Sequence, residues 1–192
     1  MNEFITTIQY IVSQTQQHLA FLLILIASLF AVLIVSKLTG NRLLLLGIHP
    51  RRLIGLPGIF CAPFLHGNFN HLFFNAIPLL VLGDFVLLFG QTVFLKVTLA
   101  IIVLSGSLTW LLGRPAIHIG ASSLITGYWS FLLINMYQQG GVMNIILGVI
   151  CVYYFAGIFL GIFPSEKGVS WEGHLFGLIA GIATSYLLPF CL

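Results

Sequence analysis

Long apolar stretches separated by short polar connections fill most of the chain. A helix needs roughly 20 apolar residues to cross about 30 Å of hydrocarbon, because each residue adds about 1.5 Å. Stretches of this kind predict membrane-spanning helices at about residues 19–36, 71–89, 92–112, 122–138, 143–162 and 172–188. The pattern therefore predicts an all-α polytopic membrane protein, a bundle of six transmembrane helices that forms one domain over residues 1–192.

The first connection, residues 37–69, is long and mixed in character. It carries four basic residues but also the apolar runs 43–46 and 54–60. Long loops inside compact domains are usually functional or disordered, and a high apolar content disfavours disorder. We expect a long interfacial first loop that lies partly in the membrane, with its basic residues at the headgroups.

The composition excludes a water-soluble domain. Hydrophobic residues make up 59% of the 192 residues and charged residues 6%, whereas soluble domains carry about 25% charged residues. Seven basic and four acidic residues are too few and too scattered for a nucleic-acid-binding surface. The expected partner is the lipid bilayer. The cysteines Cys61, Cys151 and Cys191 show no disulfide or zinc spacing, so we expect structural thiols.

The basic residues also predict an orientation. Six of the seven fall in the first, third and fifth connections, and only Lys96 lies towards the other side. The positive-inside rule would place those connections in the cytoplasm and both termini outside.

Polar residues at the start of the second span are candidates for function, because such groups are costly inside a membrane. His71 and Asn75 are four residues apart, so they share one helical face and can point donors at the same spot. His66 precedes them and could brace the loop. The alternative is that all three satisfy backbone groups of the long loop, which is the favoured interpretation for His66 alone.

The fourth span opens with Gly120-Ala121-Ser122-Ser123. A hydroxyl in the first turn of a helix lies beside unpaired N–H groups and the positive end of the helix dipole. A developing oxyanion can be stabilised there if donors point towards it. Serine is also a favoured N-cap, and many helix starts would match this pattern, so the capping role stays open.

His174 stands near the start of the last span, with Gly177 and Gly181 on the same helical face. Glycines at this spacing let membrane helices approach closely, so a short imidazole could reach a serine on a neighbouring span. A histidine that hydrogen-bonds to a loop is the alternative. Because spans alternate in direction, the second, fourth and sixth start on one side, which places His71, Ser122 and His174 at one depth.

In the order and spacing of these residues the chain resembles the rhomboid family of intramembrane serine proteases. The resemblance covers nearly the whole chain, including the six spans and the long first loop. Its motifs are His66-x4-His71-x3-Asn75, Gly120-Ala121-Ser122 and His174-x2-Gly177-x3-Gly181. Each motif is weak alone, and the ordered set is specific.

The resemblance implies a Ser–His dyad with no acidic third member. Ser122 would be the nucleophile, and His174 the general base and then the general acid. The oxyanion would be held by the Ser122 N–H with the side chains of His71 and Asn75, while His66 and Gly120 would have structural roles. No metal and no cofactor is implied.

The implied partners are transmembrane protein substrates, cut near the end of a helix where small or helix-breaking residues let it unwind. The implied location is the bacterial inner membrane, with a cytoplasmic N-terminus and an active site open to the outer side. This orientation is opposite to the one that the basic residues predict, and we follow the resemblance. Substrate entry is expected to involve movement of the fifth span or of residues 163–169. The sequence predicts no oligomeric state.

Two positions depart from the family's usual pattern. Ser123 stands where glycine follows the nucleophile, and it offers a rival hydroxyl. Thr126 stands where many members have an aromatic residue that stacks on the catalytic histidine. Either His174 is less firmly oriented here, or another ring such as Tyr128 substitutes. Glu172 is not expected to complete a triad, because two residues before His174 it faces away on a helix.

Two other functions stay open. A rhomboid-like pseudoprotease would bind membrane helices without cutting them, although such a protein would be expected to lose Ser122 or His174. A metal- or haem-binding membrane protein could use His66, His71 and His174. Metal-bound histidines usually have further ligands or supporting carboxylates, and the acid buried mid-span, Asp84, lies roughly 20 Å from His71 along a helix.

Overall fold

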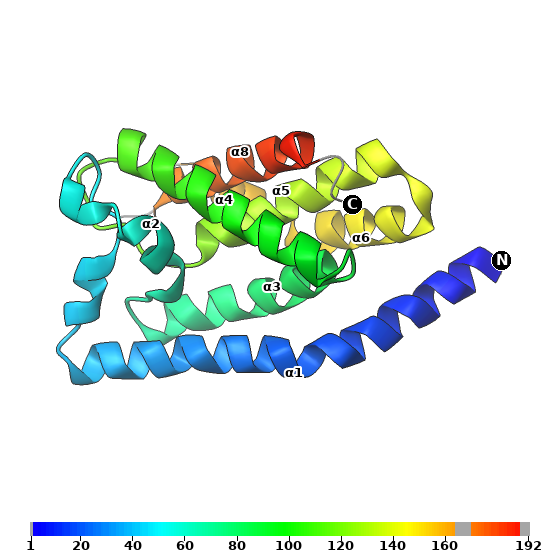
Figure 1. The fold of residues 1–192 in the computed structure, drawn as a ribbon, viewed down its shortest axis with the longest axis horizontal. Helices are drawn as coiled ribbons and strands as arrows, with labels where there is room; N and C mark the ends of the chain where they lie inside the picture. The colour runs from blue at the N-terminus through cyan, green and yellow to red at the C-terminus, as the bar shows by residue number, and fades with distance from the viewer. Residues whose placement is uncertain (1, 164–169, 189–192) are drawn as a thin grey trace.

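The computed structural model describes residues 2–163 and 170–188. In these residues the chain is helical, without a named strand and with one isolated backbone bridge between Ile48 and His118. The longer helices are α1 (Asn2–Leu38), α3 (Phe69–Leu87), α4 (Gln91–Leu112), α5 (Ser122–Gln139), α6 (Gly141–Phe155) and α8 (Trp171–Leu187). They pack side by side as a bundle (Figure 1), which confirms the all-α fold class.

Membrane-spanning character is clearest in three helices. Among the described residues, Glu3–Leu38, Phe69–Leu87 and Gln91–Leu112 are long and apolar enough to cross a bilayer, and Gly141–Phe155 is apolar but shorter. The protein is therefore a membrane protein. The predicted range 143–162 is divided, since α6 ends at Phe155 and α7 (Gly157–Leu160) follows. Gly157 stands at this break, and a glycine in a helix interior lowers helix stability by up to about 1 kcal/mol.

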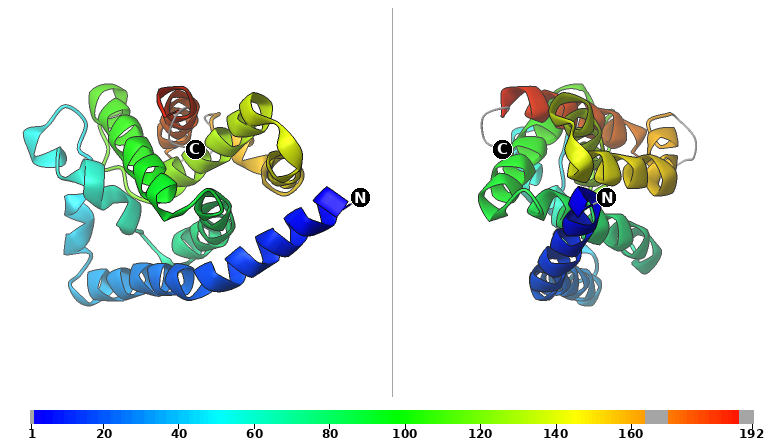
Figure 2. Two further views of the ribbon diagram at one scale, coloured as in Figure 1. Left: turned by 45° about the vertical axis from the view of Figure 1, so that its right-hand side comes forward. Right: turned by 90° about the vertical axis from the view of Figure 1, so that its right-hand side faces the viewer.

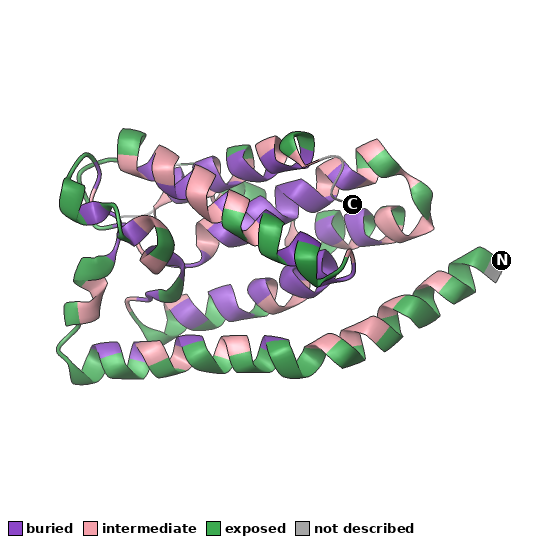
Figure 3. Ribbon diagram, in the orientation of Figure 1, coloured by how far each residue is buried: buried purple, intermediate pink, exposed green. Residues whose placement is uncertain are grey.

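α5 is the central helix of the bundle. Residues 124–132 are all buried, and Figure 3 shows buried colouring over the middle of α5, with intermediate and exposed residues towards its C-terminal end. It packs against α3, α4, α6 and most extensively α8. A helix that is buried all round forms part of a core, so the first turn of α5 and Ser122 stand on a rigid support.

α5 and α8 meet at two glycines. A Cβ atom on Gly177 would lie 2.2 Å from the carbonyl oxygen of Ser123, and one on Gly181 would lie 2.0 Å from that of Gly127. No side chain fits at such distances, so the two helices are held together at backbone contact. This brings the α8 face that carries His174 to the start of α5.

Gly181→Ala should force α5 and α8 apart. Overpacking of this kind costs roughly 1–3 kcal/mol, so we expect the midpoint of thermal unfolding in detergent to fall by roughly 2–12 °C. Gly83→Ala is the matched control, because its Cβ would make only ordinary contacts at 3.7 Å or more. Equal midpoints for the two variants would contradict the tight α5–α8 contact.

α1 lies along α3, and its N-terminal end extends beyond the bundle (Figures 1 and 2). It begins at Asn2, well before the predicted span. The buried Asp84 of α3 binds it: Nδ1 of His18 lies 2.8 Å from Oδ1, and the hydroxyl of Thr15 donates to Oδ2. A buried carboxylate needs such partners, which gives Asp84 a structural role remote from His71.

The first loop is built from short helical turns. These are η1 (Arg42–Leu46), η2 (Leu53–Gly55), α2 (Gly58–Cys61) and η3 (Ala62–Phe64). α2 packs on α4, while Leu53 and Ile54 are 79% and 75% exposed. Outward apolar side chains beside a docked helical turn suit an element in the membrane interface.

Of the cysteines, Cys61 and Cys151 are free thiols, and Cys191 lies outside the described residues.

Candidate active site

The turn before α5 is held by the first loop and by His66. Gly120 has φ +110°, a conformation that favours glycine, and its N–H donates to the carbonyl of Ala62 at 2.9 Å. The Ala121 N–H donates to Nε2 of His66 at 3.4 Å. Burial and the neighbouring His71 lower the pKa of His66 to about 4. At neutral pH the ring is therefore uncharged and keeps the lone pair that supports the turn.

Ser122 is the first residue of α5, and the cap position before it is held by Ala121 without a side-chain cap. The hydroxyl of Ser122 is therefore not an N-cap. Ser122 instead lines a cavity of about 700 Å³ and a smaller one of about 140 Å³. The neighbouring Ser123 lines neither, and its backbone lies against Gly177.

The larger cavity brings together the starts of three helices. His71 and Asn75 come from α3, Ser122 from α5 and His174 from α8. The rest of its wall is formed mainly by loop and helix-end residues, namely Gly67, Asn68, Asn70, Phe74, Ile117, His118, Ile119 and Ser170. Nucleophile, base and donor candidates thus share one space.

The smaller cavity extends from the same Ser122 and His174 towards the side of the bundle. Phe74 and Pro78 of α3 form one wall, and Ile158 and Gly161, at the α7 segment, form another. The pair therefore stands where a polar cavity at the bundle end meets a lateral space between α3 and α7. Residues 164–169, part of the segment expected to move, lie outside the described residues.

His71 and Asn75 approach the Gly120 turn. A Cβ on Gly120 would lie 2.7 Å from Nε2 of His71 and 3.6 Å from Nδ2 of Asn75. Nδ2 of Asn75 is buried and has no hydrogen-bond partner among the described residues. An unmade hydrogen bond of a buried donor costs about 1–3 kcal/mol. The amide is thus a ready donor to an oxygen that enters the cavity near Ser122.

His174 is held by a backbone oxygen. Its Nδ1 lies 2.8 Å from the carbonyl oxygen of Gly161. Tyr128, considered from the sequence as a substitute ring, is turned away: its hydroxyl contacts Thr98 of α4, so that expectation is wrong. Thr126 donates to the carbonyl of Ser122 at 2.8 Å, within α5 itself.

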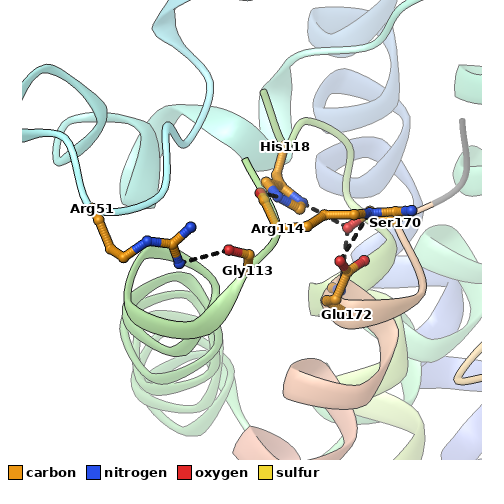
Figure 4. Close-up of polar contacts among 7 residues, drawn as sticks. Arg51, Gly113, Arg114, His118, Ser170 and Glu172 are labelled. Atoms are coloured by element: carbon orange, nitrogen blue, oxygen red, sulfur yellow. Dashed lines mark hydrogen bonds and ion pairs between the residues drawn. The ribbon is translucent and has the colours of Figure 1, made fainter. Parts of the chain in front are cut away.

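A polar network anchors the start of α8 (Figure 4). Nε of Arg114 lies 2.9 Å from Oε1 of Glu172, which is 4% exposed. Nδ1 of His118 lies 2.7 Å from the hydroxyl of Ser170, whose oxygen caps α8 by accepting from the Gly173 N–H. Glu172 is thus paired with Arg114, as expected of a residue outside the dyad.

Sequence reasoning did not single out Arg114, His118 or Ser170. The signal for Ser170 was present, because a serine just before an apolar helical run is a typical N-cap. Arg114 and His118 gave no comparable signal, since Glu172 and Ser170, the α8 residues that they contact, lie more than fifty residues away in the chain.

The histidine cluster does not form a metal centre in the part of the chain that the structure describes. No group of three or more His, Cys, Asp or Glu side chains there is arranged to hold a metal ion. The ring of His66 packs edge-on against His71, with centroids 5.1 Å apart, and turns its Nε2 to the Ala121 N–H. Within the described residues these side chains therefore offer no metal site of three or more such ligands.

Comparison with known proteins gives a consistent match. Residues 55–189 match the family model described as Rhomboid domain. Uncharacterized proteins of Mycobacterium bovis and Mycobacterium tuberculosis are each 41% identical over 177 residues, which covers 87% of this chain and 73% of each relative. An uncharacterized protein of Mycobacterium leprae is 39% identical over 177 residues, covering 87% of this chain and 70% of the relative.

Proposed function

The chain belongs to the rhomboid family, and from that premise we propose that it is a serine endopeptidase that cuts transmembrane segments of other proteins within the bilayer. Rhomboid proteins are generally intramembrane serine proteases, and some members are inactive. The observation that carries the proposal is the single cavity lined by Ser122, His174, His71 and Asn75. The alternative, a pseudoprotease that binds helices, has no observation that favours it over cleavage.

In the proposed reaction Nε2 of His174 removes the proton of the Ser122 hydroxyl as its oxygen attacks the scissile carbonyl carbon. The new C–O bond forms while the carbonyl π electrons move onto the oxygen. That oxyanion accepts hydrogen bonds from the Ser122 N–H and from the side chains of Asn75 and His71.

Collapse of the oxyanion breaks the C–N bond, and the imidazolium of His174 gives its proton to the leaving amine. A water molecule, activated by the same imidazole, then attacks the acyl–Ser122 ester. This second step releases the new carboxyl terminus and restores the serine hydroxyl. The polar wall of the larger cavity, which includes Asn68, Asn70 and Ser170, suits a site that must admit water.

The proposed substrate is a membrane-spanning helix of another protein that unwinds near one end. An intact helix keeps its carbonyl groups in intrahelical hydrogen bonds, so attack requires an extended segment. The lateral space between α3 and α7 is the proposed side of approach. The protein would act as a six-span protease of the bacterial inner membrane.

A fluorophosphonate probe, which forms a covalent bond with activated serines, tests this function. We expect the parent protein to be labelled on Ser122, as read by mass spectrometry of the modified peptide. Ser122→Ala and His174→Ala should not be labelled, whereas Ser123→Ala should be labelled like the parent. Label on Ser123, or labelling that survives His174→Ala, would contradict the proposed dyad. A parent that neither reacts nor cleaves would favour the helix-binding function.

A further inference from the structure

The contact between His174 and Gly161 determines which ring nitrogen carries the proton. A carbonyl oxygen can only accept a hydrogen bond, and the oxygen of Gly161 lies 2.8 Å from Nδ1. Nδ1 must therefore be the protonated nitrogen. In the neutral ring this leaves Nε2 with a free lone pair, which is the form that a general base needs.

Gly161 is also the residue that makes room for this contact. A Cβ atom at position 161 would lie 2.4 Å from Nδ1 and 2.9 Å from Cε1 of His174. The backbone at Gly161 has φ −66° and ψ −13°, which any residue can adopt. Space for the imidazole, and not backbone conformation, is thus the reason for a glycine here.

The side chains that could otherwise orient His174 are engaged elsewhere. Glu172 is paired with Arg114, Thr126 donates to the carbonyl of Ser122, and Tyr128 faces α4. Within the described residues, the His174 ring hydrogen-bonds to the carbonyl oxygen of Gly161.

We propose that the main-chain carbonyl of Gly161 is the positioning group of the catalytic histidine. It takes the part that a carboxylate takes in a Ser–His–Asp triad: it selects the tautomer and aims the ring. This inference rests on the proposed function for its catalytic meaning, while the contact itself is independent of any activity.

The position of Gly161 links the orientation of the His174 ring to the smaller cavity between α3 and α7. Gly161 directly follows α7, and together with Ile158 it lines the smaller cavity opposite Phe74 and Pro78. A movement of this segment away from α3 carries the carbonyl with it. In the structure the acceptor of Nδ1 is thus supplied by the residue that follows α7, and a displacement of that residue would remove the acceptor.

Gly161→Ala tests the positioning role, because its methyl group would displace the ring while the carbonyl stays in place. Gly157→Ala is the matched control for the tautomer on the same segment: Gly157 also borders the smaller cavity, and an added Cβ there meets nothing within 4 Å. The direct readout is nitrogen-15 NMR of protein with labelled histidine, with the His174 signals assigned by their loss in His174→Ala. This readout needs no substrate.

We expect His174 in the parent and in Gly157→Ala to be the tautomer protonated on Nδ1, and Gly161→Ala to lose this preference. In the cleavage assay Gly161→Ala should lower kcat by about 100-fold, the size expected for a misplaced catalytic group, with KM unchanged. A parent ring protonated on Nε2, or the same tautomer in Gly161→Ala, would overturn the inference whatever the activity. The expected tautomers in a protein that cuts no substrate would instead refute the proposed function and leave the positioning contact standing.

Discussion

Ser122→Ala and His174→Ala should each reduce kcat/KM for cleavage of a single-pass membrane substrate by at least about 10⁴-fold relative to the parent protein. The first change removes the attacking oxygen, and the second removes the only proposed acceptor for its proton. The two losses should not add in the double variant, because either residue alone leaves the dyad without function. Cleavage would be followed by gel analysis of purified protein with substrate in detergent and again in lipid vesicles.

Ser123→Ala is the matched control for the nucleophile, since it removes a hydroxyl one residue away. Ser123 lines neither cavity, so loss of its hydroxyl should change kcat/KM by no more than about twofold, which corresponds to ~0.5 kcal/mol, the usual limit for a substitution away from special features. A larger loss in Ser123→Ala than in Ser122→Ala would exchange the two roles. Equal cleavage by all variants would indicate a contaminating protease.

Asn75→Ala should lower kcat by about 10²–10³-fold, the usual effect of removing one oxyanion donor. The buried Nδ2 of Asn75 has no partner among the described residues, so its hydrogen bond would form with the reacting oxygen. Such a bond strengthens as negative charge develops, and the loss should therefore appear in kcat, with KM nearly unchanged.

Asn144→Ala controls for the removal of an asparagine from a helix of this bundle. Its amide donates to the carbonyl of Gly140, in the α5–α6 connection, and we expect no change in kcat. If Asn75→Ala raised KM and left kcat intact, Asn75 would bind substrate in the ground state and the oxyanion role would be wrong. A fall in the thermal midpoint that matched the loss of activity would point to a structural role.

Much of the bundle could be predicted because hydrocarbon imposes a simple rule on the chain. Apolar stretches of sufficient length mark α3 and α4 within a few residues. The polar residues His71, Ser122 and His174 could be singled out because they interrupt such stretches, and the direction of alternate helices places them at one end. Their common cavity could therefore be predicted from the order of the spans alone, because consecutive spans run in opposite directions.

Other features depend on contacts that no local pattern reports. The helical start of α1 at Asn2 lies in a polar segment with no hydropathy signal. The pairing of Arg114 with Glu172 joins the loop before α5 to the first turn of α8, and these two parts of the chain meet only after folding. Tyr128 was considered as a ring that could stack on His174, and this was wrong because its hydroxyl contacts Thr98 of α4. On a helix that is buried on all sides, the sequence does not indicate which neighbouring helix a side chain faces, since packing determines it.

The acceptor that orients His174 is a main-chain carbonyl oxygen, an atom that every residue has. A carboxylate that orients a histidine can be removed by one change of codon, whereas no substitution at Gly161 deletes its oxygen. Substitution there acts by adding bulk beside the ring, since a Cβ would reach Nδ1 at 2.4 Å. Mutational scanning should therefore find position 161 intolerant of every side chain in proportion to its size, with no preference for charge or polarity.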